Sequence, residues 1–145
     1  MDPFIAYLHY ISFMTLFACL VSEHLLFDTS VPARRARQLG VVDTIYGISA
    51  AAVLATGLLK WFVYGKGSAY YLSNWLFHFK LTCFILAALL SIWPTIRFIA
   101  GNRVARQGAD TVLYPKAVQH VIRVELLLIA LIPLLAALMA RGYGA

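Results

Sequence analysis

Four apolar runs constrain the fold of this chain of 145 residues more than any other feature of its sequence. They cover approximately residues 3–27, 41–64, 74–100 and 117–140, with short connections between them. A helix needs about 20 mainly apolar residues to cross the hydrocarbon core of a bilayer, and short connections make neighbouring helices antiparallel. The sequence therefore predicts an all-α integral membrane protein, with one domain built as an up-down-up-down four-helix bundle.

The composition fits a chain that resides in lipid. Hydrophobic residues make up 62% of the chain and charged residues 12%, whereas an ordinary soluble domain is about one quarter charged. Neither Cys19 nor Cys83 belongs to a CxxC or zinc-binding spacing, so both are expected to pack as small apolar side chains. The first apolar run is too long for the core of a signal peptide, so we expect it to remain as a transmembrane helix.

The distribution of positive charge predicts the orientation of the bundle. The formal net charge is +6. Most basic residues outside the apolar runs fall in the first and third connections: Arg34, Arg35, Arg37, Arg103, Arg106 and Lys116. Because cytoplasmic loops collect Lys and Arg, these connections are predicted to be cytoplasmic and both termini periplasmic or outside. This explains the positive charge without nucleic acid and predicts a multi-pass membrane protein.

Small residues recur at every fourth position in the second run, at Gly47, Ala51 and Ala55. Small side chains at this spacing let the backbones of membrane helices approach closely. We therefore expect the second helix to pack against its neighbours along this stripe.

An outer layer of ionisable residues lies near the predicted periplasmic surface. His9 and His78 sit about 6–8 Å below that surface on the first and third helices, at a rise of 1.5 Å per residue. Equal depth on two helices is what a pair of axial haem ligands needs, although hydrogen bonds to nearby carbonyl groups would also account for both histidines. Lys60 is expected to extend toward the surface. Lys80 either does the same or contacts a cofactor.

An inner layer of ionisable residues lies near the predicted cytoplasmic surface. It contains Glu23, Asp43, Arg97, Arg123 and Glu125. An unpaired charge in a low-dielectric site is costly, so we expect the acids to meet the arginines. Such a cluster is either a set of ion pairs that fixes the register of the helices, a proton entry site, or an anchor for the carboxylates of a cofactor.

Two resemblances add to this interpretation. The run DTIYGISAAAVLATGLLKWFVYGKGSAYYLSNWLFHFKL, with LLSIWPTIRF and LIPLLAALMARG after it, resembles a bacterial membrane family known as domain of unknown function 2214. That resemblance covers nearly the whole chain and implies the fold and a location in the bacterial inner membrane, without an activity. In layout the chain is also similar to the HemJ-type protoporphyrinogen oxidases, four-helix proteins described as carrying haem b. The matching residues are His9, Trp75, His78, Lys80 and Leu81.

The sequence leaves three functional hypotheses open and does not decide whether the protein is an enzyme. The first is a redox protein that binds haem b or a related tetrapyrrole, with His9 and His78 as iron ligands and Lys80 as a further contact. The second is a small proton-coupled transporter that uses the intramembrane acids. The third is a structural or accessory subunit of a homo-oligomer or larger membrane complex, without a cofactor. No nucleophile motif, phosphate-binding glycine loop or zinc spacing supports soluble-enzyme chemistry.

Overall fold

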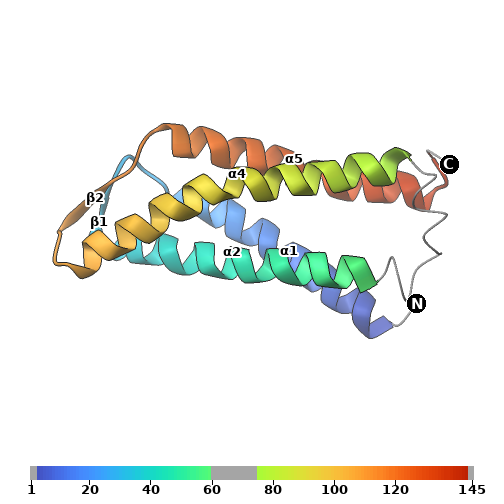
Figure 1. The fold of residues 1–145 in the computed structure, drawn as a ribbon, viewed down its shortest axis with the longest axis horizontal. Coiled ribbons are helices and arrows are strands. Elements are labelled where there is room, and N and C mark those ends of the chain that lie inside the picture. The colour runs from blue at the N-terminus through green and yellow to red at the C-terminus, as the bar shows by residue number, and fades with distance from the viewer. Residues whose placement is uncertain (1–2, 60–74, 144–145) are drawn as a thin grey trace.

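The computed structural model describes residues 3–59 and 75–143 and contains four long helices (Figure 1). These are α1 (Pro3–Leu26), α2 (Ala33–Leu59), α4 (Trp75–Arg106) and α5 (Ala117–Ala140). Each is long and apolar enough to cross a membrane. The predicted four-helix membrane fold is confirmed.

The helices form two antiparallel hairpins that pack side by side. α1 packs against α2 and α4 packs against α5, while α2–α4 and α1–α5 contacts join the two hairpins. α1 and α4 therefore lie on a diagonal of the bundle. Figure 1 shows the N- and C-termini at one end of the bundle, here called the termini end, and two short strands at the other, called the strand end.

The strands β1 (Ser30–Pro32) and β2 (Thr111–Leu113) add a feature that apolar periodicity does not predict. They pair antiparallel with Val31 opposite Val112. Further backbone bonds continue the pairing: the Ala33 N–H donates to the Asp110 carbonyl at 3.0 Å, and the Tyr114 N–H donates to the Thr29 carbonyl at 2.9 Å. The small sheet thus ties one hairpin to the other at the strand end.

Two helices extend beyond the apolar runs. α2 begins at Ala33 rather than near residue 41, and α4 continues to Arg106 rather than ending near residue 100. Hydropathy marks the part of a helix that lies in lipid, whereas Ala, Arg, Gln and Leu continue a helix into water because they are strong helix formers. The basic residues predicted in the first connection therefore stand on α2. Arg103 and Arg106 occupy the last turn of α4, where they interact favourably with the helix dipole.

The small-residue stripe of α2 does not face the bundle. Gly47, Ala51 and Ala55 are all exposed, and a Cβ added at Gly47 would meet no atom within 4 Å. Polar side chains are costly in lipid, and α2 turns its polar face inward instead. In the described part of the chain, these three residues do not pack against a neighbouring helix as predicted.

Candidate functional site

Three acidic side chains, each from a different helix, are buried inside the bundle toward the strand end. Glu23 of α1, Asp43 of α2 and Glu125 of α5 are exposed by 1%, 6% and 1%. Helical periodicity explains their position, because each shares a face with apolar core residues. Asp43 follows buried Leu39 by one turn, and Glu125 lies between buried Ile122 and Ile129.

The acids form contacts that link all four helices. The carboxyl groups of Glu23 and Asp43 lie within hydrogen-bonding reach of one another. The Tyr46 hydroxyl donates to Oε1 of Glu125 at 3.3 Å and also meets the hydroxyl of Ser91 on α4. Oε1 of Glu23 and Oε2 of Glu125 are buried and have no hydrogen-bond partner in the described part of the chain. We call this set of five residues the carboxyl cluster.

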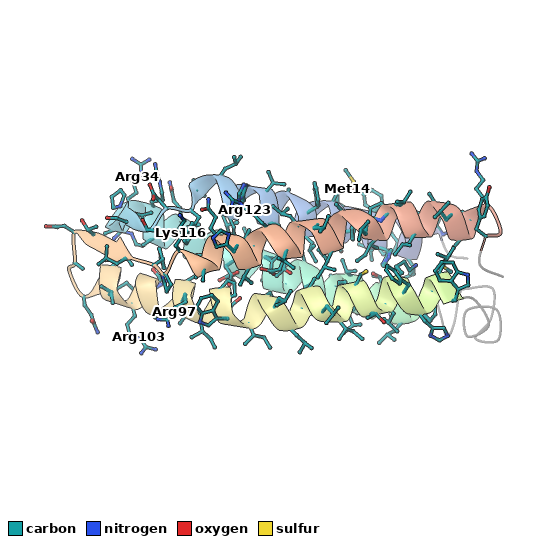
Figure 2. The ribbon with its side chains drawn as sticks, turned by 90° about the horizontal axis from the view of Figure 1, so that it is seen from above. Met14, Arg34, Arg97, Arg103, Lys116 and Arg123 are labelled. Carbon is teal, nitrogen blue, oxygen red and sulfur yellow. The ribbon has the colours of Figure 1, made fainter. Side chains whose placement is uncertain are left out.

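The arginines predicted to join this cluster lie on the outer surface. Arg97 and Arg123 are both exposed, and the Arg97 guanidinium stands 5.7 Å from the centroid of the Trp93 ring. Residues two apart on a helix do not share a face, so Arg123 points away when Glu125 points inward. Long basic side chains also reach outward from lipid toward water. Figure 2 shows both arginines among the labelled basic residues of the strand-end half. The expected pairing with the acids is therefore replaced by carboxyl–carboxyl and tyrosine–carboxyl contacts.

The outer-layer histidines are not brought together. His9 contacts Thr56 of α2, with Nδ1 at 2.7 Å from Oγ1. The Thr56 hydroxyl donates its one proton to the Ala52 carbonyl at 2.7 Å, so we assign the donor role in the first bond to His9 Nδ1–H. His78 is exposed on α4, diagonally across the bundle, and its ring meets the edge of Phe77.

The two histidines and Lys80 differ in their surroundings, and the predicted haem ligation stays a prediction. His9 is engaged with Thr56, and His78 faces outward from a helix that does not adjoin α1. Lys80 is half-buried, with Nζ at 5.9 Å from the centroid of the Phe77 ring. Lys60 lies outside the described residues. Within residues 3–59 and 75–143, no group of three or more His, Cys, Asp or Glu side chains is arranged to hold a metal ion.

Sequence reasoning missed the uncharged polar residues of the site. Tyr46, Ser49 and Thr56 share the buried face of α2 with Asp43, and all three are less than a tenth exposed. The signal is the spacing of polar positions in this apolar run: 43, 46, 49 and 56 all fall on one helical face. A buried polar stripe on a membrane helix is the feature that would have shown which face of α2 points inward.

Comparison with known proteins identifies the family of the chain. No match was found among curated proteins, and none among solved structures. One family, described as "Predicted membrane protein (DUF2214)", matches residues 1–144. The chain therefore belongs to the DUF2214 family of predicted membrane proteins.

Proposed function

We propose that this protein moves protons across the bacterial inner membrane, with Glu23, Asp43 and Glu125 as the proton-binding groups. The burial of these three acids inside the bundle, with the carboxyl groups of Glu23 and Asp43 facing each other, is the observation that carries the proposal. A hydrogen bond between two carboxyl groups needs a proton on one of them, because neither carboxylate has a hydrogen to donate. Acids buried in lipid without a cation are costly, and those that persist commonly serve proton relays.

The hydroxyl groups beside the acids can extend the relay. Tyr46 contacts both Glu125 and Ser91, and a hydroxyl group can donate one hydrogen bond while accepting another. Ser49 and Thr56 continue along the same face of α2 toward His9 at the termini end. A relay of this kind would run along α2 from the carboxyl cluster to His9.

An apolar layer interrupts that path. Leu16, Val53 and Ile129 are buried between the carboxyl cluster and Thr56, and they belong to one hydrophobic core. Because these side chains carry no donor or acceptor, protons can pass only when water or a helix movement bridges the gap. In the proposal, the carboxyl cluster loads protons from the strand end and the apolar layer acts as the barrier.

Proton flux into liposomes tests the proposal. Purified protein is reconstituted with a pH-sensitive dye inside, and a potassium gradient with valinomycin drives protons inward. We expect Asp43→Asn to abolish the flux, because the amide can no longer take up or release a proton. Asp110→Asn is the matched control, since Asp110 is exposed beside β2 at the strand end. Flux no greater than in empty liposomes, or equal flux for Asp43→Asn and the unmodified protein, would overturn the proposal.

Haem b binding stays a prediction, supported by the similarity in layout to the oxidases and by the common depth of His9 and His78. Absorption spectra of the detergent-purified protein, oxidised and reduced with dithionite, test it. A haem site that uses His78 predicts a Soret band that weakens in His78→Ala. A purified protein that shows no bound-haem spectrum, even after haemin is added and the excess removed, would contradict this prediction without affecting the proton proposal.

A further inference from the structure

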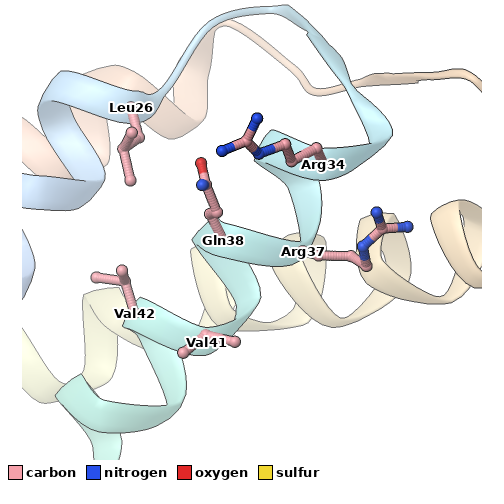
Figure 3. A pocket seen from close by; sticks show the side chains of 6 residues that line it. All are labelled: Leu26, Arg34, Arg37, Gln38, Val41 and Val42. Atoms are coloured by element: carbon pink, nitrogen blue, oxygen red, sulfur yellow. The ribbon is translucent and has the colours of Figure 1, made fainter.

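Two adjoining grooves lie at the strand end, where α1 ends and α2 begins. The larger has a volume of about 540 Å³ and is lined by Leu26, Arg34, Arg37, Gln38, Val41 and Val42 (Figure 3). The smaller has a volume of about 290 Å³ and is lined by Pro32, Arg34, Arg35 and Gln38. Arg34 and Gln38 line both grooves, so the two form one continuous depression.

The depression changes character along α2. Its outer part is lined by guanidinium and amide groups, and no acidic residue lines either groove. Its inner part is lined by Leu26 of α1 and by Val41 and Val42 of α2. Figure 3 shows the polar ends of Arg34 and Gln38 on the side that faces Leu26. From Arg34 to Val42 the helix rises about 12 Å, so the depression crosses from the basic ends of the helices into their apolar part.

We propose that this depression binds one anionic phospholipid. Guanidinium groups bind phosphate through paired hydrogen bonds, and Arg34 and Arg35 place two such groups around the smaller groove. The acyl chains lie against Leu26, Val41 and Val42. These apolar side chains would contact the chains of other lipids if the site were empty, so no additional apolar surface is exposed when the lipid binds. A free phosphate ion would use only the basic part and would leave the apolar part unused. A zwitterionic lipid would bring an ammonium group to a site without a carboxylate.

Clusters of basic residues at the ends of transmembrane helices attract anionic lipids by charge alone. The depression adds a defined site to this general attraction, because its basic and apolar parts match the headgroup and the acyl chains of one lipid. Lipid binding at this site requires no proton transport and can occur whichever leaflet the strand end faces.

Lipid retention measured by native mass spectrometry tests the inference. The full chain in detergent is incubated with phosphatidylglycerol or phosphatidylcholine. The unmodified protein should retain one phosphatidylglycerol and lose phosphatidylcholine. The double variant Arg34→Gln/Arg35→Gln should bind phosphatidylglycerol about thirty-fold more weakly, since each basic group near an anionic lipid contributes a factor of roughly five. The four polar residues that line the grooves are all exposed, so the variant should keep the fold.

The matched control is Arg103→Gln/Arg106→Gln, which removes the same charge from the strand end of α4, outside both grooves. This variant should keep the lipid. Equal loss in both double variants would show a diffuse charge effect and overturn the site. A second arm uses Val42→Gln, which leaves every arginine in place but makes the inner wall polar. Retention that is unchanged by this variant, or inorganic phosphate binding as tightly as the lipid, would reduce the site to a phosphate site and overturn the assignment to phospholipid.

Discussion

At the scale of single residues, Tyr114 shows how closely the strand end is packed. Its side chain is 5% exposed, and its hydroxyl has no hydrogen-bond partner in the described part of the chain. The ring lies edge-on to Phe98, with centroids 5.6 Å apart. It also covers Gly101, where an added Cβ would come within 2.8 Å of two carbons of the Tyr114 ring. Glycine is therefore required at position 101 by the neighbouring ring rather than by its own backbone angles.

Alkaline pH should destabilise the strand end through Tyr114. Burial raises the pKa of the Tyr114 hydroxyl to about 12, compared with about 10 in an unfolded chain. The folded state therefore favours the neutral form, so its stabilising contribution is complete below pH about 10 and is lost as pH rises toward about 12. Thermal unfolding across this range should show the decline in the unmodified protein and a smaller decline in Tyr114→Phe. Identical pH profiles for the two proteins would contradict the assignment.

Gly101→Ala should destabilise the protein by about 1–3 kcal/mol, because the new methyl group collides with the Tyr114 ring. Gly47→Ala is the control. Gly47 is also within a helix, but a Cβ there meets no atom within 4 Å, so the better helix propensity of alanine should leave stability unchanged or slightly higher. Thermal unfolding in detergent compares the two. Equal effects of the two substitutions on stability would show that the contact with Tyr114 does not cause the destabilisation.

At the scale of elements, α2 carries most of the site on one face. Asp43, Tyr46, Ser49 and Thr56 point inward, while the opposite face presents Gly47, Ala51 and other apolar residues to the surroundings. The helix thus contacts α1 through Asp43 and Thr56, and it contacts α4 and α5 through Tyr46. Changes on this single face should affect the whole bundle.

Tyr46→Phe should lower stability by about 1–3 kcal/mol, because Oε1 of Glu125 loses its donor while Oε2 already lacks one. Tyr7→Phe is the matched control, since Tyr7 is 61% exposed on α1. Thermal unfolding of both variants in the same detergent gives the comparison. A loss in Tyr7→Phe as large as that in Tyr46→Phe would show that the hydrogen bond to Glu125 is not the cause.

The elements also show where sequence reasoning succeeds and where it stops. Apolar length identifies the four helices, because lipid thickness imposes it, and charge at unusual depth identifies Glu23, Asp43 and Glu125. The same reasoning misplaced Arg97 and Arg123, because depth along a helix does not give the direction around it. The direction in which a side chain points around its helix is decided by packing between helices that are distant in sequence. The contact of Tyr46 with Glu125 and the pairing of the two strands depend on the same packing.

At the scale of the whole molecule, the strand end gathers positive charge that predicts its side of the membrane. If the positive-inside rule applies, this end is cytoplasmic and both termini are outside. Tyr143→Cys, at the termini end, should then react with an impermeant maleimide on intact cells, whereas Asp110→Cys should react only after the membrane is opened. Cys19 and Cys83 are both buried, which keeps the background low. The reverse labelling pattern would place the strand end outside.

The pairing of β1 with β2 also sets how the bundle can move. The two helical hairpins are fastened to each other by backbone hydrogen bonds at one end. These bonds resist separation of the hairpins at the strand end, so any splaying of the two hairpins would be larger at the termini end. Such a pivot would leave Glu23 and Asp43 in contact, because both belong to the same hairpin. It would stretch the contacts of Tyr46 and Glu125, which bridge the two, and so alter their environment without moving either acid across the membrane.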